Sequence, residues 1–192
     1  MKASRSFQWL LLAAAGLGPA AAEAQGRATV ELIQGSAGTT YTRATGISDA
    51  GHLVGYLQDA SGVQGWLRGA NGALTLLSLP NGSVATAVNV HGEVAGNMLS
   101  FGLPRAARWS AATGWQALDG DMATGINASG QIIGESVTGG WTWTPAGGHT
   151  LLPGPAGFGV PRGLNDAGWV VGDVATQVPG IGAAALWRPG QA

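Results

Sequence analysis

Short apolar runs alternate with turns rich in Gly, Asn and Ser along the chain after residue 40. One ten-residue pattern occurs four times, at 46–55, 87–96, 125–134 and 163–172. It consists of a small residue, an apolar residue, Asn or Ser, two variable residues, Gly, one variable residue, two apolar residues and Gly. Its central glycines are spaced by 41, 38 and 38 residues. Self-similarity at such a period indicates a fourfold structural repeat.

Each copy of the pattern predicts the tip of a β-hairpin. Asn or Ser three residues before Gly is typical of a type I turn, in which the side-chain oxygen accepts a backbone hydrogen bond and Gly adopts a left-handed conformation. Apolar residues on both sides provide the two strands, so we expect a loop of about four residues. The polar residues concerned are Ser48, Asn89, Asn127 and Asn165.

The rest of each copy predicts two more strands. A Trp recurs in each copy and is followed by a turn, and an apolar stretch at 74–77, 115–118 and 150–152 closes the first three copies. Four strands in an up-and-down order over roughly 40 residues are typical of a β-propeller blade. The fold class is therefore all-β, and the recurring side chains are expected to pack between blades: Trp66, Trp109, Trp143 and Trp187.

The fourth copy ends after Trp187 and has no closing strand, whereas a spare apolar stretch at 28–33 precedes the first copy. We predict a single β-repeat domain over 25–192, with repeats at 44–82, 83–121, 122–154 and 155–192, closed into a small propeller-like ring by 28–33. Closure would remove exposed sheet edges. An open β-repeat array, or a head-to-tail dimer that makes a larger ring, is the alternative.

The first 24 residues have the order of a secretory signal peptide: positive charges at Lys2 and Arg5, an apolar run at 9–17, and small residues at Ala22 and Ala24. The apolar run is about half the ~20 residues that a membrane span needs. We expect cleavage after Ala24, with cleavage after Ala22 as the alternative. The product is expected to be secreted or periplasmic, with no membrane insertion.

Composition and charge limit the classes of partner and of metal site that the sequence can support. The whole chain has a net charge of −1, and its only Lys lies in the predicted signal peptide, so no basic patch favours nucleic acid. There is no Cys, which excludes a disulfide framework and a thiolate metal site. The oligomeric state is left open.

The Gly-Ile-Asn-x-x-Gly-x-Ile-x-Gly pattern of 125–134, followed by a small-residue strand that ends in Trp, resembles the bacterial extracellular repeat family named for its His-Ala-Phe tripeptide. The resemblance covers 44–192. The tripeptide itself is absent, and 105–109 and 184–187 stand in its place, so the chain resembles a degenerate member. The resemblance implies export and a β-repeat structure, and it transfers no catalytic residue.

No grouping of residues predicts a metal, a cofactor or a catalytic centre. His52, His91 and His149 occupy three different repeat positions without metal-ligand spacing. A propeller hydrolase or lyase acting on polysaccharide is an alternative, because propeller loops can bring distant carboxylates together. Its candidate acids are Asp49, Glu93, Glu135, Asp166 and Asp173.

Three further tryptophans do not recur between copies. Trp115, Trp141 and Trp169 align with small or polar residues elsewhere, which predicts exposed indoles that offer flat apolar faces to a sugar ring or a partner protein. The alternative is that each is a locally buried aromatic side chain. The sequence therefore predicts a non-enzymatic binding or scaffold module for an extracellular glycan or protein. The alternatives are the carbohydrate enzyme and a purely structural extracellular component.

Overall fold

A computed structural model describes residues 30–33, 35, 38–79, 82–100 and 103–190. The predicted signal peptide at 1–24 and the first part of the spare stretch at 28–33 lie outside these residues. The chain divides into two units, 1–33 and 34–192, and the fold is that of the second unit. The described residues contain strands and no helix, which confirms the all-β prediction, and none of their elements is a helix that could cross a membrane.

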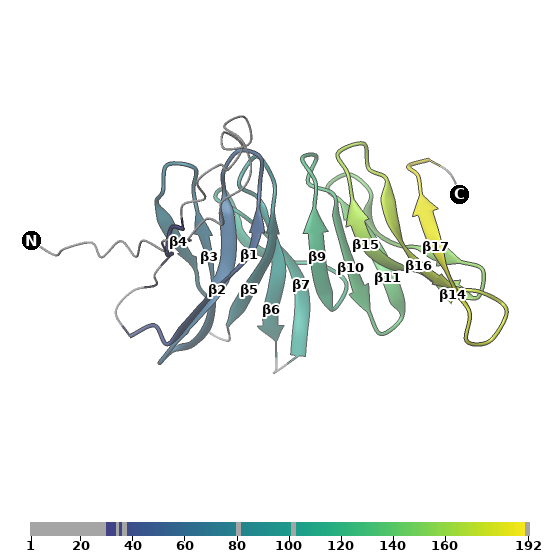
Figure 1. Cartoon of the computed structure of the whole chain (residues 1–192), viewed down its shortest axis with the longest axis horizontal. Helices are drawn as coiled ribbons and strands as arrows, with labels where there is room; N and C mark the ends of the chain where they lie inside the picture. The colour runs from purple at the N-terminus through teal and green to yellow at the C-terminus, as the bar shows by residue number, and fades with distance from the viewer. Residues whose placement is uncertain (1–29, 34, 36–37, 80–81, 101–102, 191–192) are drawn as a thin grey trace, which may run out of the picture. The chain divides into compact units, whose positions relative to one another are not determined.

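Three four-stranded sheets and one three-stranded sheet follow one another in chain order, each an antiparallel up-and-down meander (Figure 1). The first three sheets are β1 (Tyr41–Ile47), β2 (Leu53–Asp59), β3 (Gly62–Arg68) and β4 (Leu74–Leu77); β5 (Ser83–Val88), β6 (Val94–Ser100), β7 (Leu103–Ser110) and β8 (Gly114–Ala117); and β9 (Met122–Ile126), β10 (Ile132–Ser136), β11 (Gly139–Thr144) and β12 (Gly148–Leu151). The last sheet contains β15 (Val160–Leu164), β16 (Val170–Ala175) and β17 (Gly182–Trp187).

The repeated ten-residue pattern forms the hairpin tip between the first two strands of every sheet, as predicted. In the second copy, the N–H of Gly92 donates to the carbonyl of Asn89 and the N–H of Asn89 donates to the carbonyl of Glu93. The same two bonds recur in the other copies. All four central glycines have positive φ, between 74° and 81°, which is the left-handed region that favours Gly.

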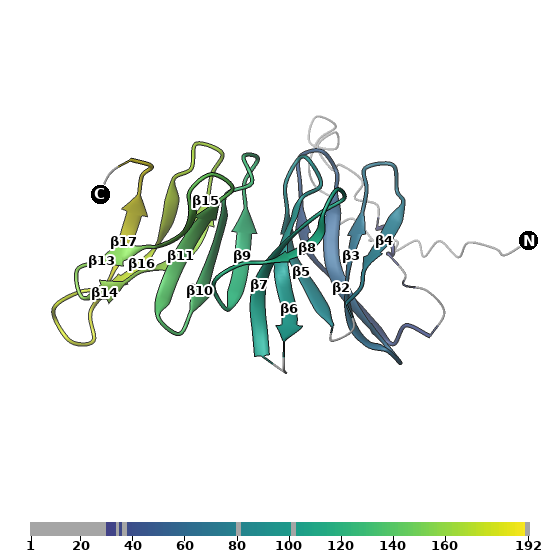
Figure 2. The same cartoon turned by 180° about the vertical axis from the view of Figure 1, so that it is seen from behind.

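The last sheet has three strands, one fewer than each of the three sheets that precede it in the repeat series. Residues 30–33 form no strand, so closure of a ring by 28–33 stays a prediction. A short hairpin that the sequence did not predict, β13 (Pro153–Gly154) and β14 (Gly157–Phe158), follows the third sheet, and β14 contacts β16 (Figure 2).

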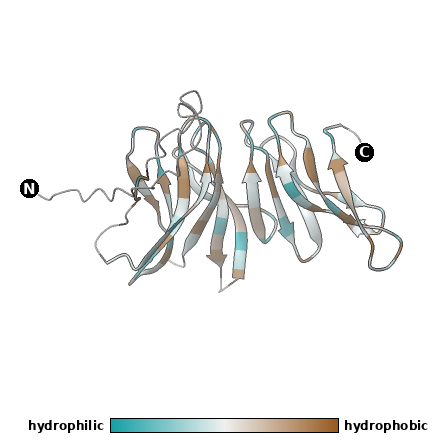
Figure 3. Ribbon diagram, in the orientation of Figure 1, coloured by the Kyte–Doolittle hydropathy of each residue, from teal (hydrophilic) through white to brown (hydrophobic). Residues whose placement is uncertain are grey.

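Successive sheets pack face to face, and each junction has its own apolar cluster. Hydrophobic stretches therefore recur on strands throughout the unit (Figure 3). The first junction centres on Val54 and Val94, the second on Ala95 and Ile132, and the third on Ile133 together with Val170. Burial of such side chains contributes about 1.5–3 kcal/mol each. The substantial contacts between strands of different sheets all join successive sheets.

Two polar contacts also connect one sheet to the next. A β-bulge in the first strand of each of the four sheets leaves one residue unpaired. In the first two sheets this residue is a Thr whose hydroxyl donates to the next sheet: Thr45 to the carbonyl of Ala85 at 2.7 Å, and Thr86 to that of Ala123 at 2.9 Å. The turn asparagines make the second contact, because the side-chain amide of each donates to the backbone carbonyl of the next, from Asn89 to Asn127 at 3.1 Å and from Asn127 to Asn165 at 2.9 Å.

Candidate functional site

Strand pairing corrects the predicted register of the tryptophans. Trp66 pairs with Gly55, the last Gly of its repeat pattern, and Trp141 pairs with Gly134, the equivalent Gly. These two tryptophans are therefore structural counterparts. Trp109, Trp143 and Trp187 lie two positions away and pair with Val94, Ile132 and Val170, where the first sheet has Arg68. The shift of two residues keeps the side chains on the same face of the strand.

The three candidate ligand-binding tryptophans have different surroundings. Trp141 is fully buried, so the expectation of an exposed indole there is wrong: the side chain fills the space above Gly134. Trp115 is half-buried, packs on the first junction cluster, and donates from Nε1 to the carbonyl of Leu77 at 2.9 Å. Trp169 is 43% exposed, and the guanidinium of Arg188 lies 5.1 Å from its ring centroid. Only Trp169 presents the expected exposed face.

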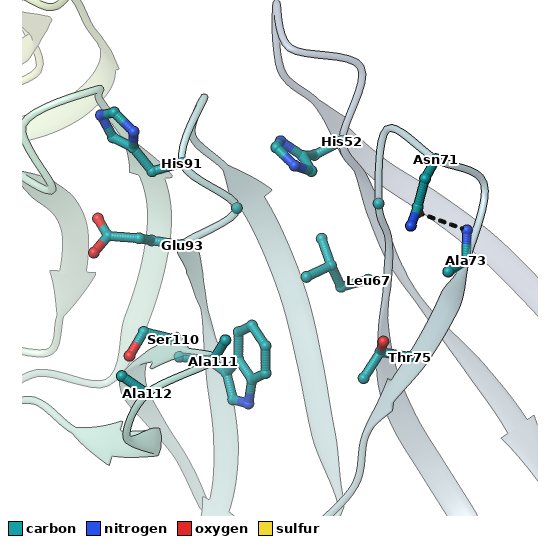
Figure 4. A pocket seen from close by; sticks show the side chains of 13 residues that line it. His52, Leu67, Asn71, Ala73, Thr75, His91, Glu93, Ser110, Ala111 and Ala112 are labelled. Carbon is teal, nitrogen blue, oxygen red and sulfur yellow. Dashed lines mark hydrogen bonds between the residues drawn. The ribbon is translucent and has the colours of Figure 1, made fainter.

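A groove of about 510 Å³ lies between the first and second sheets, at their hairpin-tip end. Figure 4 shows His52 and Asn71 on one side and His91 and Glu93 on the other, with Leu67 between them. The indole of Trp109 also lines the groove. Two imidazoles, an amide, a carboxylate and an aromatic ring therefore surround one open space, and they come from two different repeats.

The Glu93 carboxylate is fixed within this groove. One oxygen accepts a hydrogen bond from the amide of Asn89 at 2.9 Å, and the other is paired with the guanidinium of Arg108. Both partners of this ion pair are largely buried, with about a fifth of each side chain exposed, so solvent screens the pair less than it would at the surface. Because each oxygen is already engaged, Glu93 is a positioned acceptor rather than a free acid or base.

The other candidate acids lie elsewhere. Glu135 and Asp173 meet at Arg162, whose guanidinium lies 3.7 Å from a Glu135 oxygen and 2.8 Å from an Asp173 oxygen. The hydrogen bond to Asp173 raises the pKa of Arg162 above its usual value, so this pair of carboxylates faces a permanent positive charge. Asp166 accepts a hydrogen bond from the N–H of Ala128 at 2.8 Å, and Asp49 lies exposed in its turn.

The sequence does not show that the groove residues lie close in space, because they belong to different repeats. The position after each turn Gly changes type between copies: His52, Glu93, Gln131 and Trp169. In the first three sheets this side chain lies over the turn Gly of the next sheet: a Cβ added to Gly92 would lie 3.6 Å from Nε2 of His52, and one added to Gly130 or Gly168 would lie 3.1 Å from Glu93 or Gln131. Variation at one position of a regular repeat was the signal available. Among the described residues, no three His, Cys, Asp or Glu side chains form a group that could hold a metal ion.

No protein-family model and no curated protein matches the sequence. Among solved structures, the chain is similar to the crystal structure of TolB from Acinetobacter baumannii, with 12% sequence identity and a TM-score of 0.48. The match covers 77% of this chain and 41% of the TolB chain, so this chain spans less than half of that protein's length. What the groove can do therefore follows from its own residues.

Proposed function

We propose that this protein is an exported, non-enzymatic binding module whose groove between the first and second sheets holds an extracellular glycan. The observation that supports the proposal is the convergence of His52, His91, Glu93 and Trp109 on one open groove. An indole offers an apolar face on which a sugar ring packs, and the surrounding polar groups offer donors and acceptors for its hydroxyls.

The state of Glu93 supports binding over catalysis. A glycosidase needs two carboxyl groups that exchange protons or attack the sugar. Within the part of the chain that the structure describes, Glu93 is the one acidic side chain that lines the groove, and Arg108 and Asn89 engage both of its oxygens. Such a carboxylate accepts hydrogen bonds from a ligand at a fixed position, which favours recognition.

The remaining parts of the proposal concern the rest of the chain. We also propose export by the 1–24 signal peptide, membership of the His-Ala-Phe repeat family, and completion of the last blade by 28–33, from the same chain in a closed ring or from a second copy in a head-to-tail assembly. The three-stranded last sheet supports the third part, because it leaves one edge strand place unfilled beside β17.

The experiment uses the mature chain, residues 25–192, on a glycan array, followed by titration calorimetry with the glycans retained. We expect His91→Ala and Asn71→Ala to weaken binding by roughly tenfold, the effect of one or two lost hydrogen bonds. Asp119→Ala is the matched control, because this side chain is 83% exposed and lies outside the groove.

The recovered glycan is analysed by mass spectrometry. The proposal is supported if the intact protein binds the glycan, the groove variants bind it more weakly, and the glycan is recovered with its mass unchanged. Cleavage of the glycan, or binding that is unaffected by both groove variants, contradicts it.

A further inference from the structure

Every junction between sheets is built from the same two half-faces. The first half-face belongs to the earlier sheet and contains the ninth residue of its repeat pattern, which is fully buried in each of the first three sheets: Val54, Ala95 and Ile133. The second half-face belongs to the later sheet and contains three apolar side chains from its first two strands. In the second sheet these are Ala85, Val88 and Val94, exposed by 0%, 6% and 0%.

One half-face of each kind is left uncovered within residues 34–192. In the last sheet the ninth pattern residue is Val171, 50% exposed, and its cross-strand neighbour Leu186 is 42% exposed. This Val–Leu pair repeats the pair Val54–Leu67, which packs into the first junction.

The complementary half-face lies on the first sheet. Ala44, Ile47 and Leu53 pair within β1 and β2 as Ala85, Val88 and Val94 pair within β5 and β6. Ile47 is 72% exposed, whereas its counterpart Val88 is buried. The two uncovered faces are thus the two halves of the junction that the chain already makes three times.

One polar contact of the junction also has its two halves on these faces. Asn165 occupies the position of Asn89 and Asn127. Asn165 is exposed, and its Oδ1 accepts from the N–H of Trp169, as the other turn asparagines accept within their own turns. The equivalent acceptor on the first sheet is the carbonyl of Ser48. Arg162, at the bulge position of Thr45 and Thr86, is instead engaged by Glu135 and Asp173.

Trp169 occupies the position from which the earlier sheets cover the turn Gly of the next sheet. His52, Glu93 and Gln131 lie over the turn Gly of the next sheet, and Trp169 is the residue at that position in the last sheet. Its counterpart on the first sheet is Gly51, where an added Cβ would meet only the Cβ of Ala70 at 3.9 Å. Gly51 therefore offers open space of the kind that an indole covers.

We propose that the face of the last sheet around Val171, Leu186 and Trp169 binds the Ile47 face of the first sheet of a second copy of this chain, head to tail. Continuity with the three existing junctions supports a copy of the chain as the occupant, because the apolar, Asn and turn-Gly contacts all have their partners on the two faces. A second copy fits better than the chain's own first sheet, because the substantial contacts within the unit join successive sheets only and the first and last sheets lie at opposite ends of the series (Figure 1).

A contact of this kind joins two different surfaces, so it produces a closed ring or an open filament according to the rotation at each step. The inference goes beyond the proposed function, because the glycan groove lies within one copy and needs no second chain. Loss of self-association and loss of glycan binding are therefore separable results.

The test is sedimentation velocity of the mature chain over a dilution series. We expect self-association, weakened roughly 100-fold by either Ile47→Asp or Val171→Asp, since a charge at the centre of an apolar interface loses its hydration. Val137→Asp is the matched control: this Val is 97% exposed in the turn that joins β10 to β11. Leu186→Asp provides a second variant of the last-sheet face, and circular dichroism verifies that each variant is folded.

Mixing the two variants gives the decisive result. Each variant alone keeps one intact face, so the Ile47→Asp and Val171→Asp proteins are monomeric separately and form a one-to-one complex when mixed. A wild-type chain that stays monomeric at its highest soluble concentration overturns the proposal. If the wild-type chain is monomeric and the effects of Ile47→Asp and Val171→Asp on melting temperature are coupled in a double-mutant cycle, the two faces meet within one chain. A mixture of the two variants that fails to associate also overturns the proposal.

Discussion

Gly134 lies directly opposite Trp141 across β10 and β11, and a Cβ added to Gly134 would lie 2.2 Å from the indole carbon Cζ2. The same relationship joins Gly55 to Trp66 in the first sheet. In the second sheet, where Ala107 faces Gly96, the indole of Trp115 from β8 approaches that Gly instead. In three sheets an indole thus lies against the last Gly of the repeat pattern. In all four sheets the atom nearest to a Cβ added there is a backbone carbonyl oxygen of the first strand, at 1.9–2.3 Å, so the close approach of that strand also requires Gly.

Gly134→Ala is expected to destabilise the protein by more than about 3 kcal/mol, because the new methyl group would overlap both the buried indole and the carbonyl oxygen of Met122. Gly163→Ala is the matched control: the nearest atom to its added Cβ is a Val171 methyl carbon at 3.6 Å, an ordinary contact. Urea denaturation of both variants measures the difference. Equal stabilities would mean that both the indole of Trp141 and the backbone at Met122 can move away from residue 134 at little cost.

The hairpin tips could be predicted from the sequence because their cause is local. Asn127 and Gly130 lie three residues apart, and their turn forms wherever the flanking strands are placed. The tryptophan register could not be predicted, because it depends on the turns between the second and third strands. Two residues, 60–61, join β2 to β3, whereas 176–181 join β16 to β17, so equal sequence offsets do not give equal pairing partners.

The groove could not be predicted for a different reason. His52 belongs to the first repeat and His91 to the second, and a comparison of repeats aligns equivalent positions without showing which residues meet across a junction. The burial of Trp141 could not be predicted either, because a comparison of repeats does not show which strands or sheets cover a side chain. An isolated repeat position that is polar in other copies is exposed only if no neighbouring strand or sheet covers it.

Asn127→Ala is expected to cost about 2–3 kcal/mol of unfolding free energy, because it removes the amide that bonds the third sheet to Asn165 and leaves buried groups without partners. Asn165→Ala removes the equivalent side chain from an exposed position, and we expect a cost below about 1 kcal/mol in dilute protein. Thermal unfolding of both variants checks the contrast. A smaller loss for Asn127 than for Asn165 would show that the contact between turns contributes little.

Trp141→Ala and Trp169→Ala are expected to separate stability from surface recognition. Truncation of the fully buried Trp141 should cost about 3–5 kcal/mol. Truncation of Trp169 removes an exposed contact with Arg188, worth about 0.5–1 kcal/mol. Calorimetric unfolding and sedimentation velocity, applied to both variants, should show a stability loss in the first and an association loss in the second. An unchanged association for Trp169→Ala, with its fold intact, would remove the indole from the interface.

Deletion of 25–34 tests whether the stretch at 28–33 completes the last sheet. That sheet has three strands, and β17 pairs with β16 on one side, so a strand added beside β17 would protect its outward amides from solvent. We expect the deletion to accelerate hydrogen exchange in β17 while the hydrogen exchange of β6 stays as it is in the intact chain, because β6 lies inside a sheet that is already complete. The effect would be far from the deletion in sequence, which a local change at the N-terminus does not produce. Equal exchange in β17 with and without 25–34 would mean that the edge of the last sheet is completed by something else or stays open, and the ring predicted from the sequence would then be wrong.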